Sequence, residues 1–401
     1  MKKKKNYKKP NWFIYSIYKL ICKFLAKFKF NLKVLRNETK GLKGPYVIIA
    51  NHEAVIDFIN IAATVKKAHF VISYSFYHSL PIQPLLKATG VIPKQQFQTS
   101  TVDMKAMKAV LDNNMPFVIY PAGLMSEHGT ATPIPPSTGK FLKWLGHDVY
   151  VAKSTGSYLT SPKWSKIKRK GRINLDIYKL YDKTELKSLS NDELYNRVIQ
   201  ELDFNAYQSQ ETNPIEYKNG NNIEGLEYVL YKCPKCGKEF TNEVENSDTL
   251  ICNCCGNQAK ANKYGILEKV NEDDVIYNHP CDWAQNIENE LYEEIKNNPD
   301  YTLEDECVIR MIDYKKHKFV PVGNGNIKLN KEFITLTGTV NSEEITKTFK
   351  LNQYPILPFK PNVHFEIQEN NDIYRIYLKN SNMATKWVYS IKSAYKINNN
   401  L

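Results

Sequence analysis

The sequence has almost no net charge outside its first 43 residues. The 401-residue chain has 55 Lys and Arg, 42 Asp and Glu, and a formal net charge of +13. Residues 1–43 contain thirteen Lys, Arg36 and one acid, Glu38, so the rest of the chain is neutral as a block. A nucleic-acid-binding domain spreads its basic residues over the binding surface. The distribution excludes a uniformly basic nucleic-acid binder, and we expect no nucleic-acid partner.

Cysteine is also scarce. Eight Cys in 401 residues are too few for a disulfide scaffold. Five of them lie between Cys233 and Cys255, which indicates a metal site in a reducing compartment. A composition that is 42% hydrophobic and 12% aromatic excludes global disorder, and the length suggests two or three domains.

The N-terminal arm lacks a long apolar run. Its longest uncharged stretch is Pro10–Tyr18, far short of the roughly 20 residues that span a membrane. Lys19, Lys23 and Lys27 would interrupt the apolar core of a signal peptide. These lysines line one face of a predicted helix, and an apolar face lies opposite, made of Ile14, Ile17, Ile21, Phe24 and Phe28.

This pattern, preceded by six Lys in residues 1–9, is typical of a helix lying in the interface of an anionic membrane. We therefore expect residues 1–30 to be a basic amphipathic membrane-interface segment. The partner would be an anionic membrane surface, and the protein would be peripheral (monotopic) on the cytoplasmic face of the cell membrane. The alternative is an amphipathic helix docked on the next domain, with a solvated lysine tail.

Residues 31–182 have the pattern of an α/β domain. Short apolar runs predict strands at 46–50, 70–73, 117–120 and 149–152, and helical segments are predicted at 56–65 and 104–111. Alternation of strands and helices predicts a mostly parallel sheet. We then expect a helix and polar linker at 183–224, a cysteine module at 225–270, an acidic helical segment at 271–306 and a β-rich domain at 307–398. The last resembles a pleckstrin-homology (PH) or GRAM-type barrel in pattern, and its role is left open.

One motif carries the chemistry. Asn51 and His52 follow the first predicted strand, and Asp57 follows His52 after four residues. If His52 lies in the strand-to-helix turn and Asp57 in the first helical turn, the carboxylate can orient the imidazole as a general base. The alternative is a buried structural histidine. The sequence has no Gly-x-Ser-x-Gly elbow and no Walker A loop, which argues against a serine hydrolase and an NTPase.

The motif and its surroundings resemble the glycerolipid acyltransferase family of 1-acylglycerol-3-phosphate (lysophosphatidic acid) acyltransferases. Beside the Asn-His-x4-Asp motif, three further segments match family motifs in order: 90–94, 120–126 and 149–152. The resemblance covers about residues 30–180. It implies His52 and Asp57 as catalytic residues. It also implies substrate-binding residues, namely Asn51, Lys94, Tyr120, Pro121, Gly123 and Ser126.

The implied reaction moves a fatty acyl group from acyl-CoA or acyl-carrier protein to a lysophospholipid-type hydroxyl, such as that of 1-acylglycerol-3-phosphate, in phospholipid biosynthesis. The third motif departs from the family, because Ala122, Leu124 and Met125 replace its glutamate, threonine and arginine. The planar fork that would hold a phosphate is therefore lost from this turn. The departure favours a changed acceptor; the alternative is a non-enzymatic, membrane-tethered zinc-ribbon adaptor on a degenerate acyltransferase scaffold.

The cysteine module contains two Cys-x2-Cys pairs, Cys233 with Cys236 and Cys252 with Cys255. Two such knuckles complete a tetrahedral zinc site of the zinc-ribbon kind, and four thiolates make the zinc structural. Gly237 and Gly256 follow the pairs, as such turns require. Cys254 could compete with Cys252 as a ligand, and iron in a rubredoxin-like site is the alternative metal.

Overall fold

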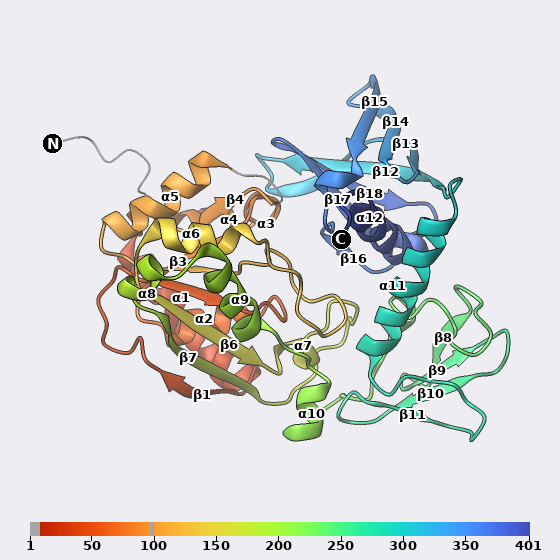
Figure 1. Ribbon diagram of the computed structural model, residues 1–401, viewed down its shortest axis with the longest axis horizontal. Helices are drawn as coiled ribbons and strands as arrows, with labels where there is room; N and C mark the ends of the chain where they lie inside the picture. The colour runs from red at the N-terminus through yellow and green to blue at the C-terminus, as the bar shows by residue number, and fades with distance from the viewer. Residues whose placement is uncertain (1–8, 97–99) are drawn as a thin grey trace. The chain divides into compact units, whose positions relative to one another are not determined.

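The chain forms two compact units in a computed structural model that describes residues 9–96 and 100–401 (Figure 1). The first unit runs to Pro162 and continues from Lys168 to Gly220. The second consists of Lys163–Ile167 and Asn221–Leu401.

The first unit is built on a seven-stranded sheet with the strand order β1-β7-β6-β2-β5-β3-β4. The strands are β1 (Leu32–Asn37), β2 (Val47–Ala50), β3 (His69–Ser73), β4 (Ile92–Lys94), β5 (Phe117–Ile119), β6 (Val149–Thr155) and β7 (Ile173–Tyr181). All neighbouring pairs are parallel except β6 and β7, so the α/β sheet that the sequence predicts is present but mixed. Strand β2, which precedes the His52 motif, is fully buried at the centre of the sheet.

Helices cover both faces of this sheet. One core cluster packs α5 (Thr101–Asp112), α6 (Ser137–Leu145), α8 (Lys183–Ser188) and α9 (Asn191–Leu202) against it. The other packs α1 (Trp12–Phe24) and α2 (Asp57–Thr64). The short helices are α3 (Tyr74–His78), α4 (Gln83–Ala88), α7 (Ser157–Thr160) and α10 (Gln208–Thr212).

Residues 183–220 are part of the first unit, which differs from the predicted helix and polar linker. Both α8 and α9 begin with a capping box, formed by Asp182 with Glu185 and by Ser190 with Glu193. Their apolar faces enter the core through Leu186, Leu194, Val198 and Leu202. The domain therefore does not close near residue 182, because these helices cover one face of its sheet.

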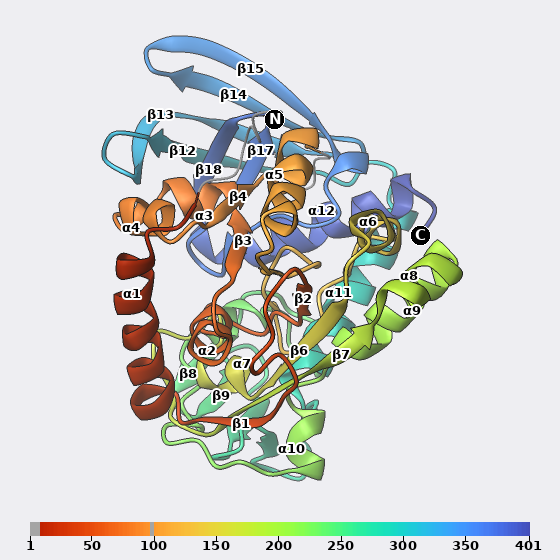
Figure 2. The ribbon, with the colours of Figure 1, turned by 90° about the vertical axis from the view of Figure 1, so that its left-hand side faces the viewer.

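The N-terminal helix α1 continues through a π-helical turn, Leu25–Lys29, and packs on α2 (Figure 2). The Tyr15 hydroxyl donates to the Ala68 carbonyl (3.1 Å) and accepts from its amide N–H (2.9 Å). Lys19 donates to the carbonyls of Val65 and Lys66 at the end of α2. Lys19 is therefore half-buried and bonded to α2, so this face of the helix is docked on the first unit.

The opposite face of α1 stays open. The large apolar side chains on this face of α1 and of the π-helical turn are more than a third exposed: Phe13, Ile17, Leu20, Ile21, Phe24 and Phe28. Phe13 is 76% and Phe24 62% exposed. Within the described residues, no helix combines the length and the apolar character needed to cross a membrane.

The second unit contains two antiparallel sheets. The smaller one joins β8 (Asn242–Glu245), β9 (Thr249–Cys252), β10 (Gln258–Ala261) and β11 (Leu267–Lys269). The larger has the order β15-β14-β13-β12-β18-β17-β16. Its strands are β12 (Leu303–Asp313), β13 (Lys318–Leu329), β14 (Phe333–Val340), β15 (Glu343–Lys350), β16 (Phe359–Lys360), β17 (His364–Glu369) and β18 (Asp372–Leu378).

Two helices complete this unit, α11 (Pro280–Asn297) and α12 (Ala384–Asn398). Trp387 of α12 is fully buried and stacks on Phe365 of β17, with ring centroids 5.8 Å apart. The predicted β-rich region is confirmed and begins at Leu303. Its resemblance to a PH or GRAM barrel remains a prediction.

A short segment of the chain, Lys163–Ile167, leaves the first unit to pack in the second. The Lys163 ammonium lies 4.0 Å from the centroid of the Phe359 ring. Trp164 is buried, and its backbone lies so close to Gly225 that a Cβ there would meet the Trp164 carbonyl oxygen.

Candidate active site and metal centre

The His52 motif lies at the carboxyl edge of the first unit's sheet. Strand β2 ends at Ala50 and the chain turns through residues 51–56 before α2 begins at Asp57. The parallel strands β5 and β6 end beside it, so Tyr120 and Ser154 belong to the same edge. Functional residues in α/β proteins gather at this edge because loops leave it on both sides of the sheet.

His52 and Asp57 meet as the sequence predicts. His52 Nδ1 lies 3.1 Å from Asp57 Oδ2. The same carboxylate oxygen accepts the Ala54 amide N–H at 2.8 Å, which fixes its orientation. A carboxylate only accepts hydrogen bonds, so Nδ1 carries the proton and Nε2 is left as the acceptor. The Asp57 side chain is fully buried, whereas that of His52 is 18% exposed and can be reached from outside.

The imidazole is held from other sides as well. The Tyr120 ring stacks on it, with centroids 4.1 Å apart and an interplanar angle of 24°. The Ser126 amide donates to the His52 carbonyl at 2.9 Å, which ties the third-motif turn to the first motif. Tyr120 therefore acts on His52 directly, in addition to any contact with substrate that the resemblance implies.

Asn51 holds the strand ends together. Its amide donates to the Ser154 carbonyl and accepts the Ser154 amide N–H, both at 2.8 Å. Asn51 is buried and both of its polar groups are used in this way. The structure thus gives the residue a positioning contact, although the sequence predicts a substrate contact.

Glu53 is a site residue that the sequence reasoning missed. Its carboxylate accepts the Tyr158 amide N–H at 2.9 Å, at the start of α7. Burial raises the pKa of this carboxyl above its usual range, and the nearby charge of Asp57 raises it further. The sequence feature that could have indicated Glu53 is its position between His52 and Asp57 in the motif.

Lys94 stands at the end of the edge strand β4 and shares the carboxyl edge with His52. Its ammonium donates to the Gln95 carbonyl at 3.0 Å, and burial lowers the pKa of its side chain. Gln96 reaches the third-motif turn and donates to the Gly123 carbonyl at 2.6 Å. The second and third motifs are therefore brought together in one loop cluster.

The other residues of the third motif differ in access. Gly123 is exposed with φ of +73°, and a Cβ there would meet nothing within 4 Å. Pro121 is half-buried. Ser126 is fully buried, donates to the Thr130 carbonyl (2.6 Å) and accepts the Gly129 amide N–H (2.9 Å). The Ser126 hydroxyl thus stabilises the turn rather than facing a substrate.

The four predicted metal-ligating cysteines form one cluster. The sulfurs of Cys233, Cys236, Cys252 and Cys255 all lie within 4.8 Å of one another. Gly237 and Gly256 both have positive φ values, +71° and +72°, and donate to the carbonyls of Cys233 and Cys252. Thiolates in two such knuckles suit a tetrahedral metal site, so these residues fit a zinc ion.

Cys254 lies outside the cluster. It is exposed, whereas Cys233 and Cys252 are buried. The Thr241 hydroxyl lies 3.2 Å from the Cys252 sulfur, as expected for a polar group beside a thiolate ligand. Cys252, and not Cys254, therefore joins Cys255 as a candidate ligand in the second knuckle.

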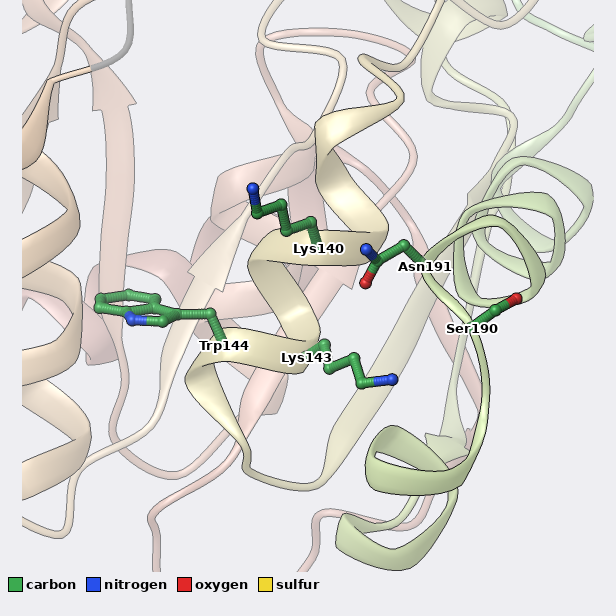
Figure 3. Close-up of a pocket in the computed structure, with 5 residues that line it drawn as sticks. All are labelled: Lys140, Lys143, Trp144, Ser190 and Asn191. Carbon is green, nitrogen blue, oxygen red and sulfur yellow. The ribbon is translucent and has the colours of Figure 1, made fainter.

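One surface depression lies apart from these sites. It is lined by Lys140, Lys143 and Trp144 of α6 together with Ser190 and Asn191 (Figure 3). Lys143 and Trp144 leave α6 on opposite sides, and Lys143 donates to the Leu189 carbonyl at 2.6 Å. None of the motif residues lines this depression.

Comparison with known proteins agrees with the motif. The model of the Acyltransferase family matches residues 30–152. No curated protein matches the chain. The crystal structure of the 1-acyl-sn-glycerophosphate (LPA) acyltransferase PlsC from Thermotoga maritima is similar at 17% identity and a TM-score of 0.40, over 50% of this chain and 78% of that chain. The family match spans β2, His52, Asp57 and the third-motif turn, so residues 30–152 are similar to the Acyltransferase family over the segment that holds these groups.

Proposed function

We propose that the protein is an O-acyltransferase that moves a fatty acyl group from an acyl thioester to a lysophospholipid-type hydroxyl. The observation that carries the proposal is the His52–Asp57 pair, 3.1 Å apart at the carboxyl edge of the sheet. His52 Nε2 removes the proton of the acceptor hydroxyl while the oxygen attacks the thioester carbonyl. Asp57 stabilises the imidazolium that forms. The thiolate then leaves and takes the proton from this imidazolium, which returns His52 to its neutral form.

The donor in this proposal is acyl-CoA or acyl-carrier protein. The acceptor belongs to the 1-acylglycerol-3-phosphate class, as in phospholipid biosynthesis. Ala122 and Met125 supply no acid and no guanidinium to the third-motif turn, and Ala122 packs on the core. This turn therefore has no guanidinium that could bind a phosphate, which favours an acceptor whose headgroup is bound by other contacts.

The same proposal places the protein at an anionic membrane surface, on the cytoplasmic face. Support comes from the open apolar face of α1 beside Lys23 and Lys27, which are both exposed. Contiguous apolar surface on a soluble protein marks an interaction site, and lysines beside it favour anionic lipid. A structural zinc ion in the Cys233 cluster completes the proposal.

A direct test offers the purified protein a panel of acceptors with acyl-CoA or acyl-carrier protein and identifies products by mass. The panel contains lysophospholipids, glycolipids and diols. We expect at least one ester product, which is lost in His52→Ala while folding and metal content persist. Acylation by His52→Ala at the wild-type rate would refute the role of the pair. No product with any donor would favour the adaptor alternative.

A further inference from the structure

Three buried polar groups beside the catalytic pair have no protein partner. They are Asp57 Oδ1, the side-chain amide of Asn60 and the Tyr120 hydroxyl. Both the oxygen and the nitrogen of the Asn60 amide are without a partner. Asp57 and Asn60 are fully buried, and Tyr120 is 8% exposed. Buried polar groups in proteins are rarely left without a hydrogen bond, so four such atoms on residues linked to the pair need an explanation.

Each of these groups is linked to Asp57. Asp57 and Asn60 are three residues apart on α2, so their side chains lie on the same helical face. The Tyr120 ring stacks on His52, which contacts the other oxygen of Asp57. The charge of Asp57 also raises the pKa of Tyr120, although burial is the larger cause.

The donors and acceptors of this group complement one another. Asp57 Oδ1 accepts only, the Asn60 amide has a donating NH2 group and an accepting oxygen, and the Tyr120 hydroxyl can donate and accept. An internal water needs two to four polar partners, which this set provides. Asn60 has no exposed surface, so bulk solvent does not supply its hydrogen bonds.

We propose that Asp57 Oδ1, the Asn60 amide and the Tyr120 hydroxyl bind one internal water molecule, which makes Asn60 and Tyr120 positioning residues for the His52–Asp57 pair. The water donates to Asp57 Oδ1, so that both oxygens of the carboxylate are fixed. The carboxylate then keeps the direction in which it holds His52 Nδ1. The catalytic part of this inference rests on the proposed acyl transfer, whereas the water site does not.

The test uses the full chain and three variants: Tyr120→Phe, Asn60→Leu and the double variant. Tyr120→Phe keeps the ring that stacks on His52 and removes only the hydroxyl. Tyr46→Phe is the control, because Tyr46 is a buried tyrosine of the same core cluster whose hydroxyl interacts with Thr39 instead. A high-resolution crystal structure of the wild type should show an ordered water within hydrogen-bonding distance of all three groups.

Thermal unfolding distinguishes a water site from orphaned polar groups. With a water site, the double variant leaves Asp57 Oδ1 without its donor, and we expect the melting temperature to fall by about 2–4 °C. If the polar groups are only orphaned, apolar replacements of similar shape raise the melting temperature instead. A rise, together with a crystal structure that shows no water there, would overturn the proposal.

Kinetics test the positioning role separately. We expect each single variant to lower kcat by about tenfold and to leave KM unchanged, because the water contacts the carboxylate and not the substrate. An unchanged kcat in both variants would overturn the positioning role. If the wild type acylates no acceptor, the proposed function fails, whereas the crystal structure and melting temperatures still decide the water site.

Discussion

The side chain of Asn51 and the backbone of Ser154 exchange two hydrogen bonds of 2.8 Å, across 103 residues of sequence. This exchange joins the ends of β2 and β6 next to His52. In Asn51→Ala both backbone groups of Ser154 lose their buried partner, so we expect a loss of about 1–3 kcal/mol in the free energy of unfolding. Chemical denaturation measures it. An unchanged unfolding midpoint would show that the exchange does not hold the strand ends.

Asp57→Asn tests the orientation of the imidazole. The amide is nearly isosteric and can still accept from the Ala54 N–H, but it no longer stabilises the imidazolium. We expect kcat to fall by about 10²–10⁴-fold with the fold retained. Asp176→Asn is the matched control, because Asp176 pairs with Arg36 on the surface of the same sheet. Equal activities of the two variants would contradict the catalytic role of Asp57.

Glu53→Gln tests the buried carboxyl beside Asp57. Because burial raises the pKa of Glu53, the folded state favours the protonated form. The resulting stability is complete below the ordinary glutamate pKa and is lost as the pH rises through the folded-state pKa. We therefore expect the melting temperature of Glu53→Gln, relative to wild type, to increase as the pH rises from 5 to 9. Glu211→Gln, at an exposed position, should show no such trend.

The cysteine cluster predicts one metal ion per chain. Cys233→Ser removes a buried ligand and should abolish metal binding, whereas Cys254→Ser, at an exposed cysteine outside the cluster, should retain it. Elemental analysis of the purified proteins measures both and separates zinc from iron. A chelator should unfold the β8–β11 region, because metal binding contributes folding free energy there. Metal-free wild-type protein with a native melting curve would refute the site.

The open face of α1 predicts lipid binding. Deleting the helix would also uncover α2, so substitutions are the sharper test. Leu20→Ser with Phe24→Ser, both on the exposed face, should weaken binding to vesicles of anionic phospholipid at least tenfold. Val102→Ser is the control, because Val102 is 66% exposed on α5. Retained vesicle binding by the double variant would exclude this face as the membrane contact.

The basic side of α1 gives a separate prediction. Lys23→Gln with Lys27→Gln should weaken vesicle binding by about 1 kcal/mol per residue at low salt, and the difference should shrink as salt is raised. Lys19 is different, because it contacts the carbonyls of Val65 and Lys66. We expect Lys19→Gln to lower the melting temperature, whereas Lys23→Gln and Lys27→Gln should affect mainly lipid binding. Equal effects of all three lysines on binding would contradict this division.

Local sequence patterns predicted what depends on local spacing. The strands at 117–120 and 149–152, the His52–Asp57 contact and the cysteine knuckles each follow from a few neighbouring residues. The contacts of Asn51 with Ser154 and of Glu53 with Tyr158 join segments more than 100 residues apart, so nothing in the local pattern indicates them. The substrate contact expected for Asn51 comes from the family resemblance, which carries no information on these long-range contacts.

The sequence of residues 183–220 indicates a helix, but it does not indicate that the apolar face of this region is buried. Polar residues on the outer faces of α8 and α9 resemble those of a linker, and only the packing of Leu194 and Val198 shows which sheet they cover. The lysine stripe of α1 shows the same limit, because Lys19 contacts the end of α2 whereas Lys23 and Lys27 are exposed. A lysine in an amphipathic helix can cap a neighbouring helix as well as face lipid, and periodicity does not distinguish the two.

The path of the chain through Lys163–Ile167 has a consequence for dissecting the protein. No single cut separates the two units, because this segment lies between two parts of the first unit and packs in the second. Truncation after Gly220 would remove the contacts of Trp164 with Gly225 and of Lys163 with the Phe359 ring. The first unit is thus discontinuous in sequence, interrupted by a five-residue insert that belongs to the second unit, and a fragment that ends at Gly220 carries this insert without the residues it packs on.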